Sequence, residues 1–220
     1  MQHIVITGGN KGIGLALVQQ QLAMGNQVTV LCRNTSAELA QTDATVHSGV
    51  ELSDLAQIQQ LASTFSAKSI DVLINNAGIF SNETLADFDL ARIQLQFQVD
   101  ALAPLALSQA LLPALKEGAK IAMITSRMGS ISDNGSGAYY GYRMAKAALN
   151  AGSVSLARDV APRNIHVGIY HPGFVQTQMV GFAGDISPDE AASRIIQRIS
   201  ELDASRSGKF YHSNGSELPW

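Results

Sequence analysis

The stretch VITGGNKGIGLAL, residues 5–17, constrains the fold more than any other part of the chain. A short apolar run ends at Thr7, glycines follow at positions 8, 9, 12 and 14, and a helical pattern begins. Backbone without side chains lets a pyrophosphate approach closely, and the N-terminus of a helix offers free N–H groups and positive potential. A glycine-rich turn without a ligand is the alternative. The place of the turn directly after an opening strand favours phosphate binding.

Apolar runs and helical patterns alternate along the rest of the chain. Strands are predicted at 3–7, 27–32, 44–48, 70–75, 120–126, 164–171 and 208–212. Helices are predicted at 12–24, 53–65, 87–117 and 142–160, and a last helix is predicted to begin at Ser187 and Pro188. Several strands are continuous apolar runs, as expected where both faces of a sheet are covered. We therefore predict a single α/β domain over residues 1–220, a doubly wound Rossmann fold with a seven-stranded, mostly parallel sheet and helices on both faces.

Composition excludes several classes of protein. The chain has 220 residues, a formal net charge of −3 and no run of Lys and Arg, which argues against a nucleic-acid partner. Cys32 is the only cysteine, so no internal disulfide is possible and a reducing compartment is expected. No signal peptide is evident, and no apolar run approaches the ~18 residues of a spanning helix. Together these features lead us to expect a cytoplasmic protein without a membrane partner. His47, His166 and His171 have no evident ligand partners, so we expect no metal site.

Four further motifs follow the glycine loop in order. They are NNAG at 75–78, TSRMG at 125–129, YRMAK at 142–146 and PGFVQT at 172–177. Together with the T-G-x-x-x-G-x-G spacing of the first loop, they resemble the short-chain dehydrogenase/reductase family over nearly the whole chain. The ending SGKFYHSNGSELPW and the short segment 178–187 resemble a compact subgroup that includes the bacterial C-factor signalling protein and small carbonyl reductases.

This resemblance implies a cofactor half at about 1–118 and a catalytic and substrate half at about 119–220. The residues it assigns to a nicotinamide cofactor are Gly8, Asn10, Lys11, Gly12, Ile13, Gly14, Arg33, Asn34, Glu51, Leu52, Asn75, Asn76, Ala77, Gly78, Tyr142, Lys146, Pro172, Gly173, Val175 and Thr177. Glu51 and Leu52 fall where the family usually has an Asp–Val pair beside adenine.

The second predicted strand indicates which nicotinamide cofactor is preferred. An NAD-preferring enzyme ends this strand with an acidic residue that binds the ribose hydroxyls. Here Cys32, Arg33 and Asn34 stand in its place, and Lys11 lies in the glycine loop. Two cations suit a 2′-phosphate, since each charge-assisted hydrogen bond contributes ~1.5–3 kcal/mol. Both cations could instead be solvated surface charges, but we expect NADP(H) to be preferred over NAD(H).

Tyr142 and Lys146 lie one turn apart on the same face of the predicted helix. A free tyrosine has a pKa near 10, and a neighbouring ammonium stabilises the phenolate; lowering the pKa by ~3 units takes ~4 kcal/mol. The resemblance implies that Tyr142 protonates a substrate carbonyl oxygen while the nicotinamide supplies a hydride. It also implies that Lys146 holds the nicotinamide ribose and that Ser126 orients the carbonyl.

Two departures from the family pattern stand out. Ser126 and Tyr142 are sixteen residues apart rather than about thirteen, so Ser130 and Ser132 remain alternatives for the catalytic serine. Asp100 falls where the family's long helix usually carries an asparagine that helps to hold a water leading protons to the lysine. We therefore hypothesise a proton relay that is retained but altered.

These features favour one of three functions. The leading prediction is an NADP(H)-dependent oxidoreductase that interconverts a small carbonyl compound and an alcohol. Asp100 and the C-factor-like ending keep open a nucleotide-binding signalling or sensing protein with little turnover. A sugar-nucleotide epimerase or dehydratase is disfavoured because only about forty residues follow Thr177. The family's long helices often pair between subunits, so a homodimer or homotetramer is expected.

Overall fold

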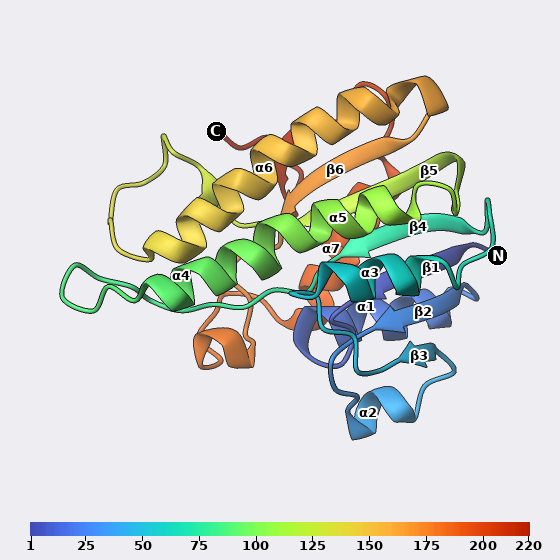
Figure 1. Cartoon of the computed structure of the whole chain (residues 1–220), viewed down its shortest axis with the longest axis horizontal. Coiled ribbons are helices and arrows are strands. Elements are labelled where there is room, and N and C mark those ends of the chain that lie inside the picture. Colours follow the sequence, from blue (N-terminus) through green and yellow to red (C-terminus); the bar gives the residue numbers. More distant parts are fainter.

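The computed structural model describes residues 1–220 and contains one seven-stranded sheet with helices on both faces (Figure 1). The strand order is β3-β2-β1-β4-β5-β6-β7, and every pair of neighbouring strands is parallel. The strands are β1 His3–Thr7, β2 Gln27–Leu31, β3 Thr45–His47, β4 Ile70–Asn75, β5 Leu115–Ile124, β6 His166–His171 and β7 Phe210–His212. The predicted α/β fold with a seven-stranded parallel sheet is confirmed.

The helices lie in the predicted intervals, apart from the short α2, which was not predicted. They are α1 Gly12–Ala23, α2 Ala37–Ala40, α3 Leu55–Ala62, α4 Leu90–Phe97, α5 Ala103–Leu111, α6 Tyr140–Val160 and α7 Pro188–Ser200. A π-helical turn at Gln98–Leu102 joins α4 to α5, and single 3-10 turns lie at Arg127–Gly129, Ala161–Arg163 and Gln178–Val180. Helix α7 begins as predicted, because the Ser187 hydroxyl accepts the Glu190 N–H at 3.1 Å. None of the helices combines the length and the apolar character that crossing a bilayer needs.

Alternate residues of the strands build two separate cores. Val5 and Leu73 pack toward α3, α5 and α6 on one face of the sheet. Their neighbours Ile4, Ile6 and Ile74 pack toward α1 and α7 on the other face (Figure 1). Because both faces are covered, the strands need apolar residues at successive positions, which accounts for their continuous apolar runs.

The predicted helix over 87–117 is wrong at both of its ends. Helix α4 begins only at Leu90, α5 ends at Leu111, and β5 begins at Leu115, five residues before the predicted strand. Leu115 pairs with Ile70, and the register then shifts before the regular pairing from Lys120 onward. Gly118 has φ +77°, which allows this irregularity. Helix α6 begins at Tyr140, two residues earlier than predicted, so Tyr142 lies within its first turn.

The order of the strands determines where a ligand can bind. The chain moves outward from β1 to β2 and β3, then returns to place β4 on the opposite side of β1. The segments that follow β1 and β4 therefore lie beside each other at the carboxyl edge of the sheet. Ligands of doubly wound sheets bind at such a switch point.

Candidate active site

The glycine loop is packed too closely for side chains. Gly8 has φ +68°, and a Cβ there would lie 2.9 Å from the Cα of Ala77. A Cβ on Gly14 would lie 2.1 Å from the carbonyl oxygen of Gly8. No side chain caps the N-terminus of α1, where Lys11 holds the N-cap position. The first-turn N–H groups of α1 therefore face a cradle of bare backbone, which fits a pyrophosphate.

The NNAG segment is bonded directly to the glycine loop. The Thr7 hydroxyl accepts the N–H groups of Asn76 and Ala77, each at 3.0 Å. The Asn76 side-chain amide donates to the carbonyl oxygens of Thr7 and Gly8 at 3.1 and 3.3 Å. Asn75 is buried and donates to the Ser108 hydroxyl at 3.1 Å, which ties the end of β4 to α5. The structure thus brings the first two motifs together at the switch point.

The PGFVQT segment lies against the same loop. Gly173 has φ +101°, and Val175 is buried and forms a parallel bridge with Ile186. A Cβ on Gly12 would lie 3.3 Å from Cγ2 of Thr177, so the end of this segment sits on the glycine loop. Residues 172–177 therefore form one wall of the predicted cofactor site.

Arg33 and Lys11, the two cations predicted to bind a 2′-phosphate, contact different neighbours in the structure. The Arg33 guanidinium lies 3.8 Å from the Glu51 carboxylate, and its side chain is 70% exposed. The Lys11 ammonium donates to the side-chain oxygen of Gln178 at 3.0 Å. Asn34 is exposed, whereas Leu52 packs against the core beneath α3.

Tyr142 and Lys146 meet on the buried side of α6. The Lys146 ammonium lies 5.6 Å from the centre of the Tyr142 ring and donates to the Ile124 carbonyl oxygen at 3.3 Å. Burial raises the pKa of Tyr142, while the charge of Lys146 and the hydroxyl of Ser126 oppose this effect. The net direction is opposite to the lowered pKa expected from the sequence, because the cost of burying a phenolate outweighs the attraction of the ammonium.

Of the three candidate serines, Ser126 is the one beside Tyr142. It is the second residue after β5, is 8% exposed, and its hydroxyl accepts the Met128 N–H at 3.1 Å. The hydroxyl of Ser130 instead accepts the Asp133 N–H, and that of Ser132 donates to the carbonyl oxygen of Trp220. The wider spacing from Ser126 to Tyr142 is therefore taken up in the loop between them.

Asp100 lies in the π-helical turn and is completely buried. One carboxylate oxygen accepts the Ile79 N–H at 2.8 Å; the other lies 3.7 Å from the Lys146 ammonium and has no hydrogen-bond partner. Burial raises the pKa of Asp100, and Lys146 opposes this shift. A Cβ on Gly78 would lie 3.3 Å from the carboxylate, so the NNAG segment closes directly over the ion pair.

His171 belongs to this edge of the sheet, although its sequence context carried no signal of a special environment. It ends β6, and its ring meets that of His212 edge to face at 4.9 Å. Its Nδ1 is buried without a hydrogen-bond partner. Burial, reinforced by His212, lowers the pKa of His171 to about 3, so the ring is neutral at physiological pH.

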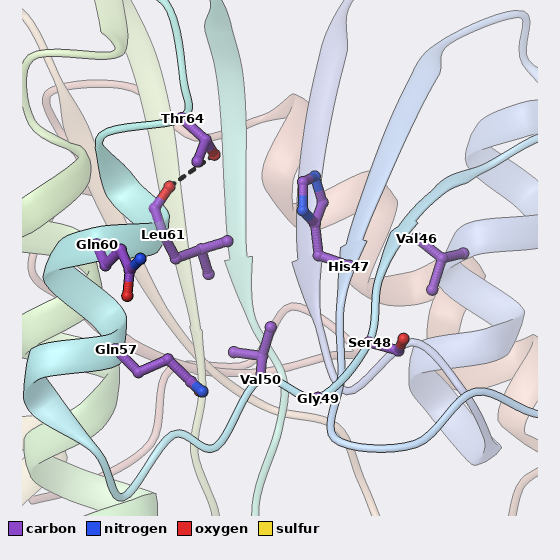
Figure 2. Close-up of a pocket in the computed structure, with 9 residues that line it drawn as sticks. All are labelled: Val46, His47, Ser48, Gly49, Val50, Gln57, Gln60, Leu61 and Thr64. Carbon is purple, nitrogen blue, oxygen red and sulfur yellow. Dashed lines mark hydrogen bonds between the residues drawn. The ribbon is translucent and has the colours of Figure 1, made fainter.

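A separate surface hollow of about 470 Å³ lies between the end of β3 and α3 (Figure 2). It is lined by residues 46–50 and by Gln57, Gln60, Leu61 and Thr64. Its lining ends one residue before Glu51, whose N–H donates to the side-chain oxygen of Gln57. The hollow therefore borders the predicted adenine end of the cofactor site and contains none of the residues around Tyr142.

The glycine cradle and the motifs converging on it define a dinucleotide-binding α/β protein. A family model described as short chain dehydrogenase matches residues 2–187. The 1-hydroxy-2-glutathionyl-2-methyl-3-butene dehydrogenase of Rhodococcus sp. (strain AD45) is 34% identical over 226 aligned positions that span all of both chains. C-signal of Myxococcus xanthus is 40% identical over 154 positions, covering 69% of this chain and 93% of C-signal. The NADPH-bound carbonyl reductase from chicken fatty liver superposes with a TM-score of 0.90 at 31% identity, covering 100% of this chain and 99% of the reductase.

These comparisons establish the family. The chain belongs to the short-chain dehydrogenases, and it is an NAD(P)-dependent oxidoreductase. The resemblance drawn from the five sequence motifs is thereby confirmed, including the likeness to C-signal and to carbonyl reductases.

Proposed function

We propose that this protein reduces a small carbonyl compound to an alcohol with NADPH, or catalyses the reverse reaction, and that Tyr142, Lys146 and Ser126 are its catalytic residues. The observation that carries the proposal is their juxtaposition: one phenol, one buried ammonium and one hydroxyl, at the carboxyl edge of the sheet where the glycine cradle lies. A protein that only bound the nucleotide would not need a tyrosine, a lysine and a serine in this arrangement.

The proposed chemistry assigns one task to each side chain. A bound nicotinamide supplies the hydride that adds to the carbonyl carbon. Tyr142, kept protonated by its raised pKa, donates its phenolic proton to the carbonyl oxygen, which completes the alcohol. The Ser126 hydroxyl orients that oxygen, and the Lys146 ammonium stabilises the phenolate that Tyr142 leaves behind. Asp100 faces Lys146 and is placed to take part in returning a proton to it.

Preference for NADP(H) forms the second part of the proposal. Arg33 is largely exposed beside the site, and its one ion-pair partner lies at 3.8 Å, so its guanidinium can turn toward a 2′-phosphate. Lys11 lies in the glycine loop and donates to a neutral group, the side-chain oxygen of Gln178. Turning toward a 2′-phosphate would cost it only this one hydrogen bond. The NADPH-bound chicken reductase supports the same cofactor for this chain.

The test combines cofactor titration with turnover. NADPH and NADH are titrated in parallel, and the wild type, Tyr142→Phe and Tyr140→Phe are then assayed on a panel of carbonyl compounds. Tyr140 is the matched control because it lies in the same helical turn but packs on Phe88, with no lysine beside it. We expect tighter binding of NADPH, turnover by the wild type and Tyr140→Phe, and loss of turnover in Tyr142→Phe.

A signalling or sensing role with little turnover is the second candidate. It is favoured by the 40% identity to C-signal of Myxococcus xanthus and by Asp100. Tight NADPH binding with no turnover on any carbonyl would support this candidate and exclude the reductase.

We further infer a homodimer or homotetramer. Phe97, Leu102 and Met144 are 37%, 42% and 55% exposed and line one groove of about 310 Å³ along α4, the π-helical turn and α6. An apolar groove of this kind fits a second copy of the same helices. Light scattering should show a dimer or tetramer for the wild type and a smaller species for Met144→Glu.

A further inference from the structure

Glu83 is a completely buried carboxylate with no cationic group within 4.0 Å; the charge of Arg92 reaches it only from farther away. It lies between β4 and α4, and its carboxylate accepts hydrogen bonds from three groups. The Gln96 amide donates to both of its oxygens at 3.1 and 3.2 Å, the Gly141 N–H donates at 3.1 Å, and the Ser81 hydroxyl donates as well. These bonds outweigh the effect of burial and hold the pKa of Glu83 below its usual range, so the group is an anion.

The anion lies at the N-terminus of α6, the helix that carries Tyr142. Tyr139 holds the N-cap position with φ +55° and provides no side-chain cap. Glu83 takes over this role from a distant part of the chain: its carbonyl oxygen accepts the Tyr139 N–H at 2.8 Å, and its carboxylate accepts that of Gly141. A negative charge at a helix N-terminus is stabilised by the free N–H groups and the helix dipole.

Gly141 makes this contact possible. A Cβ at this position would lie 2.3 Å from Nε2 of Gln96 and 3.0 Å from the Glu83 carboxylate. It would also lie 3.0 Å from the Cα of Ile93, a main-chain atom of α4, so a larger residue would displace the Gln96 amide and the Glu83 carboxylate and crowd the first turn of α6 against α4. Tyr142 is the next residue and would move with that turn.

The segment that carries Glu83 also contacts the Tyr142 ring. Phe80 meets that ring edge to face at 5.0 Å and stacks on Tyr139 at 5.6 Å. The Ser81 N–H donates to the side-chain oxygen of Gln96 at 3.0 Å, which fixes this segment against α4. Glu83 therefore belongs to a buried polar network that connects α4 to the first turn of α6.

We propose that Glu83 is a positioning residue for Tyr142: its carboxylate caps α6 and so holds the first turn of this helix, with the phenol, in the position that proton donation requires. This inference rests on the proposed reductase function for its kinetic consequence, but not for its structural one. The cap itself exists whether or not the protein turns over a carbonyl.

The test compares Glu83→Ala with Asp54→Ala. Asp54 accepts the N–H groups of Ala56 and Gln57 and caps α3, which carries no residue of the proton-donating group. Glu83→Ala should lower kcat by ~10- to 100-fold, the cost expected when a reacting group is misplaced by ~1 Å. KM and NADPH affinity should stay within about twofold, and amide hydrogen exchange at 139–146 should accelerate. Asp54→Ala should change none of these.

A charge-relocating pair separates positioning from general destabilisation. Glu83→Gln places an amide donor among donors, and adding Gln96→Glu restores an acceptor for it within the same network. The double variant should recover kcat relative to Glu83→Gln. Unchanged exchange at 139–146 in Glu83→Ala would overturn the inference whatever the activity. So would an unchanged kcat, given an active wild type. An inactive wild type with exchange accelerated in Glu83→Ala would instead reject the reductase function and retain the cap.

Discussion

Gly129 offers a direct test of how the Ser126 segment is held on α6, the helix that carries Tyr142. A Cβ at this position would lie 2.8 Å from the carbonyl carbon of Lys146, 2.9 Å from its oxygen and 3.0 Å from the nitrogen of Ala147. These are main-chain atoms in the middle of α6, so no side chain can turn aside to make room. Asn150 reinforces the contact by donating to the Gly129 carbonyl oxygen at 3.5 Å.

The cost of Gly129→Ala can be worked from these distances. Ordinary contacts of a Cβ begin at 3.4 Å, so the loop and the helix must separate by about 0.6 Å. Overpacking of this kind lowers the free energy of unfolding by ~1–3 kcal/mol. The same shift separates Ser126 from Tyr142, and a displacement approaching 1 Å at reacting groups lowers kcat by ~10- to 100-fold.

Gly135→Ala is the matched control, because it lies in the same loop and a Cβ there meets nothing within 4 Å. Urea unfolding measures stability, and steady-state kinetics with NADPH and a carbonyl substrate measures kcat and KM. We expect Gly129→Ala to lose both stability and kcat while Gly135→Ala keeps both. Equal stability and equal kcat in the two variants would refute the close docking of the loop on α6.

Three further predictions address single charges. In Asp100→Asn, the limb of the pH–rate profile that reports Tyr142 should move to lower pH, because the Asp100 charge helps to raise that pKa; an unchanged profile would count against a relay role. Arg33→Ala should weaken NADPH binding by ~10- to 100-fold in fluorescence titrations and leave NADH binding nearly unchanged, since a charge-assisted bond to phosphate contributes ~1.5–3 kcal/mol. Between pH 6.5 and about 3 the unfolded chain binds a proton that buried His171 resists, so the free energy of unfolding of the wild type should decrease as the pH is lowered through this window. His171 should contribute a slope of ~1.4 kcal/mol per pH unit, and this contribution should be absent in His171→Asn.

The strands and the site motifs could be predicted because they depend on local sequence. Runs such as residues 70–75 combine β-branched and apolar residues in a length that favours a buried strand, and the structure places β4 there. Glycine spacing after β1 predicted a bare-backbone cradle, and the positive φ angles of Gly8 and Gly12 agree with that reading. Such features need no knowledge of the distant contacts of the chain.

Features that depend on tertiary contacts could not be predicted. The π-helical turn that directs Asp100 toward Lys146 adds one residue to a helical turn, which the periodicity of residues 87–117 does not reveal. Glu83 lies in the segment SNETLADFD, whose composition is that of an exposed loop, and Asp87 in the same segment is indeed largely exposed. What buries Glu83 is the approach of Gln96 and Gly141 from other elements.

The Y-x-x-x-K spacing brings Tyr142 and Lys146 to one face of α6, but the helix alone does not decide how far either side chain lies from a cofactor. That position is set where other segments dock on α6, and glycine occupies the contact point in each case. Gly129 seats the Ser126 loop on the backbone of Lys146, Gly78 closes over the Asp100 carboxylate that faces the lysine, and Gly141 admits the Glu83 cap. A methyl group would clash at Gly129 and Gly141 and would crowd the Asp100 carboxylate at Gly78, so the placement of the phenol depends on residues that carry no chemistry of their own. Substitutions at these glycines should therefore reduce kcat even though every proposed catalytic side chain is still present.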